Sequence, residues 1–215
     1  MSNRALTIVL VTFFILLAAG FMGFYYNTTR SLPKSLPIIG NEGHKVDTFT
    51  FYNQDGKLIT EKDVAGKVYV VEYFFTTCKG ICPKMNENMT KVYQAYRGNP
   101  DVLILSHSVD PESDTVAAMK AYSQRFNADA KQWMFLTGTK QRLYDMAFDS
   151  YLISAVDSTR PTSVEEAFIH DNHFVLVDHN GRLRGRFYDG LKPAELDTLI
   201  TDIHVLLDEK EKEKN

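Results

Sequence analysis

The chain opens with one long apolar run. From Ala5 to Tyr26 no residue carries a charge, and a helix of about 20 apolar residues is long enough to cross the hydrocarbon core of a bilayer. A cleaved export signal is the alternative, with Ala18-Ala19-Gly20 as a small-residue cleavage site. Because the apolar run continues past that site, an uncleaved anchor is favoured, with residues 1–4 as a short cytoplasmic N-terminus and the rest of the chain exported.

The remainder of the chain divides into three parts. Residues 27–37 are rich in Ser, Thr and Pro, which predicts an extended spacer. Residues 38–207 carry the strand and helix patterns of one globular domain. The charged sequence at 208–215 predicts a frayed, solvated helix end.

Within residues 38–207, strand and helix patterns alternate. Continuous β-branched and aromatic runs predict buried strands, helical spacing of apolar residues predicts helices, and Asp-Gly or Asn-Gly between alternating runs predicts hairpins. In chain order these patterns predict a hairpin at 47–60, a strand at 66–75, a helix at 83–97, a strand at 101–109, a helix at 114–126, a strand at 133–136, a helix at 140–151, a polar loop at 153–167, a hairpin at 173–189 and a helix at 192–207.

This order of elements predicts the fold class. Alternating strands and helices followed by a hairpin and a helix are typical of an α/β sandwich of the thioredoxin type, here with an N-terminal hairpin and a preceding transmembrane helix. The composition is that of an ordinary globular protein, with 44% hydrophobic and 24% charged residues. A net charge of -3 offers no basic footprint for nucleic acid, so nucleic-acid binding is not among the expected functions.

The candidate chemistry lies in Cys78 and Cys82, the only two cysteines. Proline is favoured at the first helical position, so Pro83 predicts that Cys82 is the N-cap of a helix and that Cys78 lies in the loop before it. This spacing lets both sulfurs turn toward one point. The unpaired amides and the dipole of a helix N-terminus favour thiolate over thiol, which predicts a reactive pair.

Three uses of this pair are open. A structural disulfide is disfavoured, because a short closed loop removes little entropy from the unfolded chain and a domain of this size has enough core without one. Thiol exchange needs only the two sulfurs. A metal site needs a third ligand, and the residue pattern does not choose among His107, His170 and His173. The other three histidines are expected to have no role in the site: His44, His179 and His204.

Four motifs indicate which of these uses applies. TTCKGICPKM, SVDPESDT, WMFLTG and IHDNHFVLVDHNGRL occur in this order. Together, from about Leu36 to Leu207, they resemble the SCO (SenC) family of membrane-anchored copper proteins, which assist assembly of the copper centre of cytochrome c oxidase. The sequence departs from the family pattern between the cysteines, where it has Lys79-Gly80-Ile81 and relatives frequently have an acidic residue.

The resemblance implies a ligand set and partners. It implies that Cys78, Cys82 and His170 hold copper, as Cu(I), Cu(II) or both, and that His173 is not a ligand. It also implies a role for Asp110 in transfer or partner contact, with helix capping as the alternative, and His107 is a possible accessory ligand. The implied partners are the copper-receiving subunit of the oxidase and an upstream copper donor or thiol reductant.

Elementary chemistry agrees with copper, since two soft thiolates and an imidazole suit that metal, although zinc accepts the same ligands. An exported thiol–disulfide oxidoreductase that uses Cys78 and Cys82 as its redox pair, and reduces cysteines of the oxidase subunit or of other exported proteins, is the alternative. Thioredoxin-like reductants carry a proline just before the late strand, where this chain has Phe168-Ile169-His170, and this favours the metal site. The expected location is a bacterial cytoplasmic membrane, crossed once, with the soluble domain facing the periplasm or the cell exterior.

Overall fold

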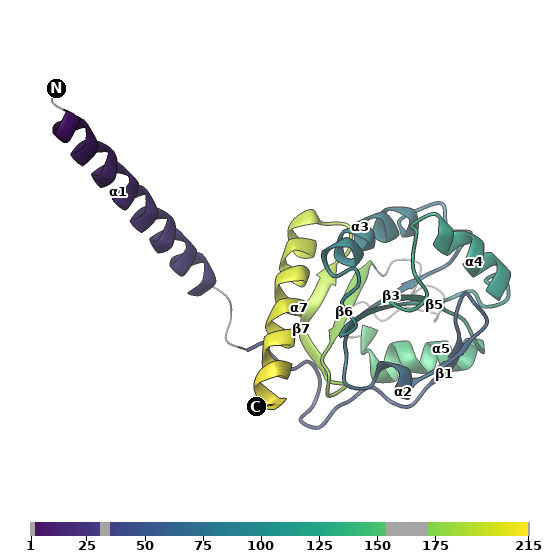
Figure 1. The fold of residues 1–215 in the computed structure, drawn as a ribbon. Coiled ribbons are helices and arrows are strands. Elements are labelled where there is room, and N and C mark those ends of the chain that lie inside the picture. Colours follow the sequence, from purple (N-terminus) through teal and green to yellow (C-terminus); the bar gives the residue numbers. More distant parts are fainter. Residues whose placement is uncertain (1–2, 31–34, 154–171, 215) are drawn as a thin grey trace. The chain divides into compact units, whose positions relative to one another are not determined.

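The computed structural model describes residues 3–30, 35–153 and 172–214. The chain divides into two compact units, residues 1–34 and residues 35–215, which are described separately (Figure 1).

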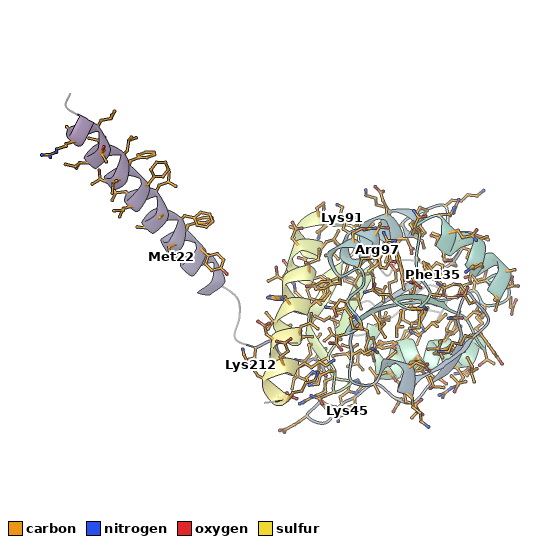
Figure 2. The ribbon with its side chains drawn as sticks, viewed as in Figure 1. Met22, Lys45, Lys91, Arg97, Phe135 and Lys212 are labelled. Atoms are coloured by element: carbon orange, nitrogen blue, oxygen red, sulfur yellow. The ribbon has the colours of Figure 1, made fainter. Side chains whose placement is uncertain are left out.

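The first unit consists of one helix, α1 (Asn3–Arg30). Its segment Arg4–Tyr25 is long and apolar enough to cross a membrane, by length and composition, and none of it is buried. Side chains project from all sides of this helix, Met22 among them (Figure 2). The prediction that the spacer starts at residue 27 is wrong, because α1 continues to Arg30; the next helix-breaking residue along the chain is Pro33.

The second unit is built on a five-stranded sheet with the strand order β5-β4-β3-β6-β7. Strands β3, β4 and β5 are parallel to one another, β6 runs antiparallel to β3, and β7 runs antiparallel to β6. A separate two-stranded antiparallel hairpin is formed by β1 and β2. The bounds are β1 (Thr50–Tyr52), β2 (Leu58–Thr60), β3 (Val68–Phe74), β4 (Val102–Ser108), β5 (Trp133–Leu136), β6 (His173–Val177) and β7 (Leu183–Asp189).

Helices cover the sheet on both faces, which gives the thioredoxin-like fold that the sequence predicts (Figure 1). The sheet has α3 and α7, which pack against each other, on one face, and α5 with the β1–β2 hairpin on the other. The helical elements are α2 (Glu61–Val64), α3 (Cys82–Ala95), α4 (Val116–Gln124), α5 (Lys140–Asp145), a π-helical turn η1 (Met146–Ser150) and α7 (Pro193–Lys214).

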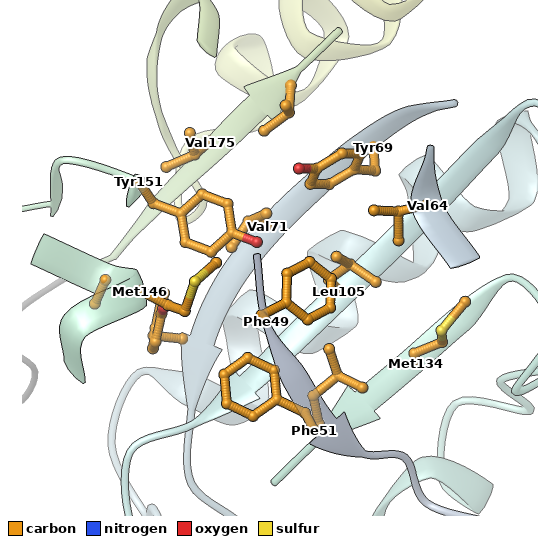
Figure 3. Packing of buried hydrophobic residues seen from close by; sticks show 14 of the residues in the cluster. Phe49, Phe51, Val64, Tyr69, Val71, Leu105, Met134, Met146, Tyr151 and Val175 are labelled. Carbon is orange, nitrogen blue, oxygen red and sulfur yellow. The ribbon is translucent and has the colours of Figure 1, made fainter. Parts of the chain in front are cut away.

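The central strand β3 is buried on both faces, so its side chains alternate between two packed layers. Tyr69, Val71 and Tyr73 belong to a hydrophobic cluster that includes Phe49 and Tyr151. Figure 3 shows this cluster, with residues of the hairpin, the sheet and the α5–η1 region pointing toward one another. By the same alternation, Val70, Glu72 and Phe74 of β3 belong to the other layer, on the side of α3.

Two helix predictions need correction. The expected helix at 140–151 changes to a π-turn at Met146, where the Tyr151 amide donates to the Met146 carbonyl at 2.9 Å. This geometry presents the Ser150 carbonyl to His44 Nε2, at 2.9 Å, so the ring of His44 has a structural partner. The backbone after this turn is strained, since Leu152 has a φ of 54°.

The charged end at 208–215 is also different from the prediction. The helix α7 continues to Lys214 instead of fraying after residue 207. Its end is held by ion pairs to the rest of the domain: Lys210 Nζ lies 2.6 Å from Asp101 Oδ1, and Glu209 Oε2 lies 2.9 Å from Arg184 Nη2. Because Lys210 and Arg184 are buried, this segment is part of the packed structure.

Candidate metal and thiol site

The two cysteines lie where the chain passes from β3 into α3. The loop turns at Cys78, whose amide donates to the Phe75 carbonyl at 3.2 Å. The helix begins at Cys82, and its N-cap is Ile81, which offers no side-chain cap. The prediction that Cys82 is the N-cap is therefore wrong by one residue, because Pro83 takes the second position of the first turn, where its missing N–H also has no intrahelical acceptor to lose.

Both cysteines are free thiols, and they differ in exposure. Cys78 is half-buried, whereas Cys82 is only 4% exposed. Burial, together with the hydrogen-bond contact to the Cys78 thiol, raises the pKa of Cys82 above the ordinary value of a cysteine. For Cys82 this opposes the predicted preference for thiolate, because desolvation disfavours the charged form.

A buried carboxylate ties the cysteine loop to the strand beside it. Asp114 is fully buried, and its Oδ1 accepts from the amide of Thr76 at 3.0 Å and from the Thr76 hydroxyl at 2.5 Å. The other oxygen accepts from the Ser108 hydroxyl at 2.5 Å. Asp114 therefore fixes the residue that lies two positions before Cys78.

Asp114 belongs to the same segment as the Asp110-Pro111-Glu112 motif. The Asp110 amide donates to Ser108 Oγ at 3.0 Å, and the Asp114 amide donates to the Asp110 carbonyl at 2.8 Å. The N-cap of α4 is Thr115, whose hydroxyl accepts from the Ala118 amide at 3.2 Å. Helix capping by Asp110 is therefore excluded. The sequence treated Asp114 only as a helix start, because its partner Thr76 is distant along the chain.

A second buried acid lies under the cysteines on the face that packs α3. Glu72 is fully buried in the middle of β3. Its Oε1 accepts a 2.5 Å hydrogen bond from Ser106, which in turn accepts a 2.9 Å bond from the Trp133 indole. Glu72 Oε2 has no partner within the described residues. Burial raises the pKa of Glu72 to about 8, and its charge acts on Cys82. Sequence analysis did not single out Glu72, although it is the one carboxylate in a strand of apolar and aromatic residues.

His107 has a different environment. It pairs with Tyr73 across β3 and β4, and its ring stacks on that tyrosine at 5.2 Å. The Phe51 ring lies edge-on at 5.3 Å, which places His107 in the cluster on the face away from Glu72. Neither ring nitrogen has a partner within the described residues, and burial lowers the pKa of His107 to about 3. The surroundings of His107 are those of a packed core residue.

The remaining candidate histidines lie at the late hairpin. His170 falls outside the described residues. His173 is the first residue of β6, is half-buried and pairs with Asp189 of β7. Within residues 3–30, 35–153 and 172–214, no three His, Cys, Asp or Glu side chains converge as a metal site. The described donor set is therefore the pair of cysteines.

The other histidines have ordinary surroundings. His179 Nε2 lies 2.8 Å from Glu213 Oε2, and the exposed His204 lies 4.0 Å from Asp208 on the next turn of α7. His179 lies in the β6–β7 turn and His204 in the last helix.

Comparison with known proteins assigns this arrangement to a family. The sequence model of SCO1/SenC matches residues 40–206, which is most of the chain. The chain belongs to the SCO1/SenC family. The curated SCO1 protein homolog of Bacillus subtilis (strain 168) is 33% identical over 162 residues, covering 74% of this chain and 81% of the relative.

Solved structures of SCO1/SenC proteins agree with the fold. A SCO1/SenC family lipoprotein from Bacillus anthracis is 31% identical, with a TM-score of 0.66, covering 80% of this chain and 99% of the other. BsSco, described as having a disulfide switch and as a member of the Sco family of cytochrome c oxidase assembly proteins, is 31% identical, with a TM-score of 0.63, covering 76% and 93%. ScoI of Bradyrhizobium japonicum, solved with copper bound, is 24% identical, with a TM-score of 0.56, covering 73% and 97%.

Proposed function

We propose that this protein binds copper through Cys78, Cys82 and His170 and assists assembly of the copper centre of cytochrome c oxidase. The observation that carries the proposal is the pair of unbridged, adjacent thiols at the start of α3 in a SCO1/SenC member. His170 comes from the family resemblance alone. Copper is the cargo, and the recipient is the copper-receiving subunit of the oxidase.

The donor set supports copper over harder metals. Two thiolates are soft ligands, and imidazole completes a set that copper accepts in either oxidation state. Because thiols must lose their protons on metallation, the raised pKa of Cys82 makes loading sensitive to pH. A relative with copper bound is known in ScoI of Bradyrhizobium japonicum, and the role in oxidase assembly follows the description of BsSco.

The proposed topology follows from α1. Residues 5–26 anchor the chain in the membrane, residues 1–4 stay in the cytoplasm, and the copper-binding domain of residues 38–207 faces the periplasm or the cell exterior. The helix is long and apolar enough for this role. Under this proposal the spacer is the segment between Arg30, where α1 ends, and Ser35, where the domain begins, and the charged end belongs to the domain.

A second candidate function is favoured by the difference in burial between the two thiols. A half-exposed Cys78 and a buried Cys82 form the arrangement in which one sulfur attacks a disulfide and the other closes the pair. The second candidate is an exported thiol–disulfide oxidoreductase that acts on the oxidase subunit or on other exported proteins. Both functions use the same sulfurs, and copper binding as a dithiolate is excluded while the disulfide is formed.

His170 separates the two functions. The full chain, purified in non-ionic detergent and reduced, is expected to bind one copper per chain with thiolate-to-copper absorption, and the oxidised chain is expected to bind none. Cys82→Ser should abolish tight binding and His170→Ala should weaken it strongly, whereas the matched control His173→Ala should change little. Full oxidase activity at limiting copper in a His170→Ala strain would overturn the copper-delivery proposal in favour of thiol exchange.

A further inference from the structure

A groove of about 530 Å³ lies beside the half-exposed Cys78. It runs between the cysteine loop with the start of α3 on one side and the end of α4 on the other. The residues that line it are Thr76, Thr77, Cys78, Lys79, Pro83, Tyr122, Arg125 and Phe126. Any molecule that approaches the Cys78 sulfur along this path contacts both helices.

The charge of the groove is of one sign. Lys79 and Arg125 are both exposed, and no Asp or Glu is among the residues that line it. Neither cation forms an ion pair with another described residue. Lys84, one turn along α3, is by contrast paired with Glu87 at 3.0 Å. In a chain with a net charge of -3, two cations that have no ion-pair partner among the described residues and lie beside the half-buried Cys78 thiol favour binding of an anionic group.

The arginine is held in place at the groove. The Arg125 guanidinium lies 5.4 Å from the centroid of the Tyr122 ring, a cation–π contact that orients the side chain without using its hydrogen-bond donors. Phe126 packs on the same tyrosine with ring centroids 5.3 Å apart. The wall opposite the cysteine loop is therefore an aromatic surface with a cation on it.

The floor of the groove contains a polar group without a partner. Tyr122 is 4% exposed, and its hydroxyl has no hydrogen-bond partner within the described residues. The charges that act on this hydroxyl include those of the buried Glu72 and of both thiols. A buried donor left without a partner is unfavourable, so a sulfur or carboxylate that reaches this hydroxyl from the groove can accept a hydrogen bond from it.

We propose that this groove is the docking site for an acidic segment of a partner protein that presents a cysteine to Cys78. The proposal rests on the proposed function, because it names the partner chemistry of the same two thiols. Carboxylates of the segment pair with Lys79 and Arg125, and the partner sulfur lies between Cys78 and the Tyr122 hydroxyl. A segment of a protein is favoured over a small anionic disulfide because the groove is lined by apolar as well as charged side chains along two elements.

The exchange step at this site balances as follows. The Cys78 thiolate attacks the near sulfur of a disulfide, a new S–S bond forms between Cys78 and that sulfur, and the old S–S bond breaks with its electron pair on the leaving sulfur, which takes a proton. The Cys82 thiolate then attacks Cys78, closes the pair and releases the partner thiol. The partner disulfide is reduced by two electrons and the cysteine pair is oxidised.

The test uses short peptides with one cysteine activated as a pyridyl disulfide, which releases the neutral chromophore 2-thiopyridone. Three peptides differ only in the residues that flank the cysteine, which are Asp, Asn or Lys. With the reduced full chain in non-ionic detergent, the Asp peptide is expected to react about tenfold faster than the Lys peptide. The ratio should fall toward one between about 0.1 M and about 1 M salt. Each rate is divided by the rate with free 2,2′-dithiodipyridine, which removes differences in thiol reactivity.

The variants locate the effect. The double change Lys79→Gln and Arg125→Gln should bring the Asp-to-Lys ratio close to one. The matched control is Arg97→Gln, since Arg97 also lies over a tyrosine ring, that of Tyr93 at 5.8 Å, but at the far end of α3 (Figure 2). Tyr122→Phe should slow all three peptides by the same factor and leave the ratio unchanged.

Several results would overturn the proposal. These are a ratio of Asp-peptide rate to Lys-peptide rate near one in the wild type, a ratio that is unchanged in the double variant, or a decrease of this ratio in Arg97→Gln as large as that in the double variant. A further probe is a small thiol that carries a carboxylate but no peptide, activated as the same pyridyl disulfide. If it reacts as fast as the Asp peptide, the occupant is a small anionic disulfide and the partner-protein proposal is wrong. Copper binding by the same preparations is measured separately. If the chain binds copper but reacts with all three peptides at the same rate, the proposed docking site is wrong. If it reacts faster with the acidic peptide but binds no copper, the proposed function is wrong.

Discussion

Ser106 donates a 2.5 Å hydrogen bond to Glu72 from the neighbouring strand, and the two residues are direct partners in the β3–β4 register. The next pair along these strands is Tyr73 and His107, whose side chains point to the opposite face. One step along the same two strands therefore separates a buried acid on one face from a buried base on the other. Their effects on stability have opposite dependence on pH.

Glu72 is expected to make the domain less stable as the pH rises. Burial raises its pKa from 4.5 to about 8, so between these values the folded state holds a proton that the unfolded state has lost. The free energy of unfolding should fall by up to about 1.4 kcal/mol per pH unit across this window. Glu72→Gln should remove this slope. Urea unfolding followed by the fluorescence of Trp133, the only tryptophan, measures it.

His107 should have the opposite effect at lower pH. Burial lowers its pKa from 6.5 to about 3, so between these values the unfolded state binds a proton that the folded state does not. Stability is then lost as the pH falls below 6.5, by up to about 1.4 kcal/mol per pH unit. His107→Phe should remove this loss and keep the aromatic stacking, whereas His204→Gln, at an exposed position, should not. If the free energy of unfolding of His107→Phe still fell below pH 6.5 as in the wild type, the explanation would be contradicted.

The elements that local patterns determine were predicted well. The strand at 133–136 matches β5, and the turn at Asn180-Gly181 joins β6 to β7, with Gly181 at a φ of 77° that favours glycine. The parallel and antiparallel parts of the sheet follow from the order of such elements. The pairing of Cys78 with Cys82 at a helix start also follows from spacing, except for the exact cap position.

What the sequence did not reveal depends on contacts between distant residues. Glu72 reads as one polar residue in a buried strand, and its role emerges only when Ser106 and Trp133 are placed beside it. Asp114 reads as a helix start until Thr76 is brought to it. The pKa of Cys82 depends on burial under the rest of the domain, which competes with the helix N-terminus and is not visible from local spacing.

The end of α7 should contribute to stability. Glu209 pairs with Arg184, whose side chain is 8% exposed, and Arg184 also donates to Asp178 and to the Leu36 carbonyl. Glu209→Gln should lower the free energy of unfolding by about 1–2 kcal/mol, because a charge-assisted bond to a buried guanidinium is lost while the other two partners remain. Lys212→Gln, at an exposed position of the same helix, should stay within about 0.5 kcal/mol of the wild type. Equal effects of both changes in thermal or urea unfolding would contradict a packed role for this segment.

Asp114 should control the cysteine loop without touching the sulfurs. Asp114→Ala leaves the Thr76 amide and the hydroxyls of Thr76 and Ser108 without their acceptor, which should lower the free energy of unfolding by about 2–4 kcal/mol. Asp114→Asn keeps one oxygen for Thr76, so most of that stability should return. The local signature is hydrogen exchange at the Thr76 amide, which should become faster in Asp114→Ala and recover in Asp114→Asn.

The functional consequence follows from the position of Thr76, two residues before Cys78. If Asp114 positions the loop, copper affinity of the reduced chain should fall in Asp114→Ala in step with faster exchange at Thr76, and Asp114→Asn should restore both. Asp110→Asn is the matched control, because only the backbone of Asp110 takes part in this network. It should leave exchange at Thr76 unchanged. Loss of copper affinity in Asp110→Asn with normal affinity in Asp114→Ala would show that the acidic motif acts through the Asp110 side chain, and the positioning role of Asp114 would be wrong.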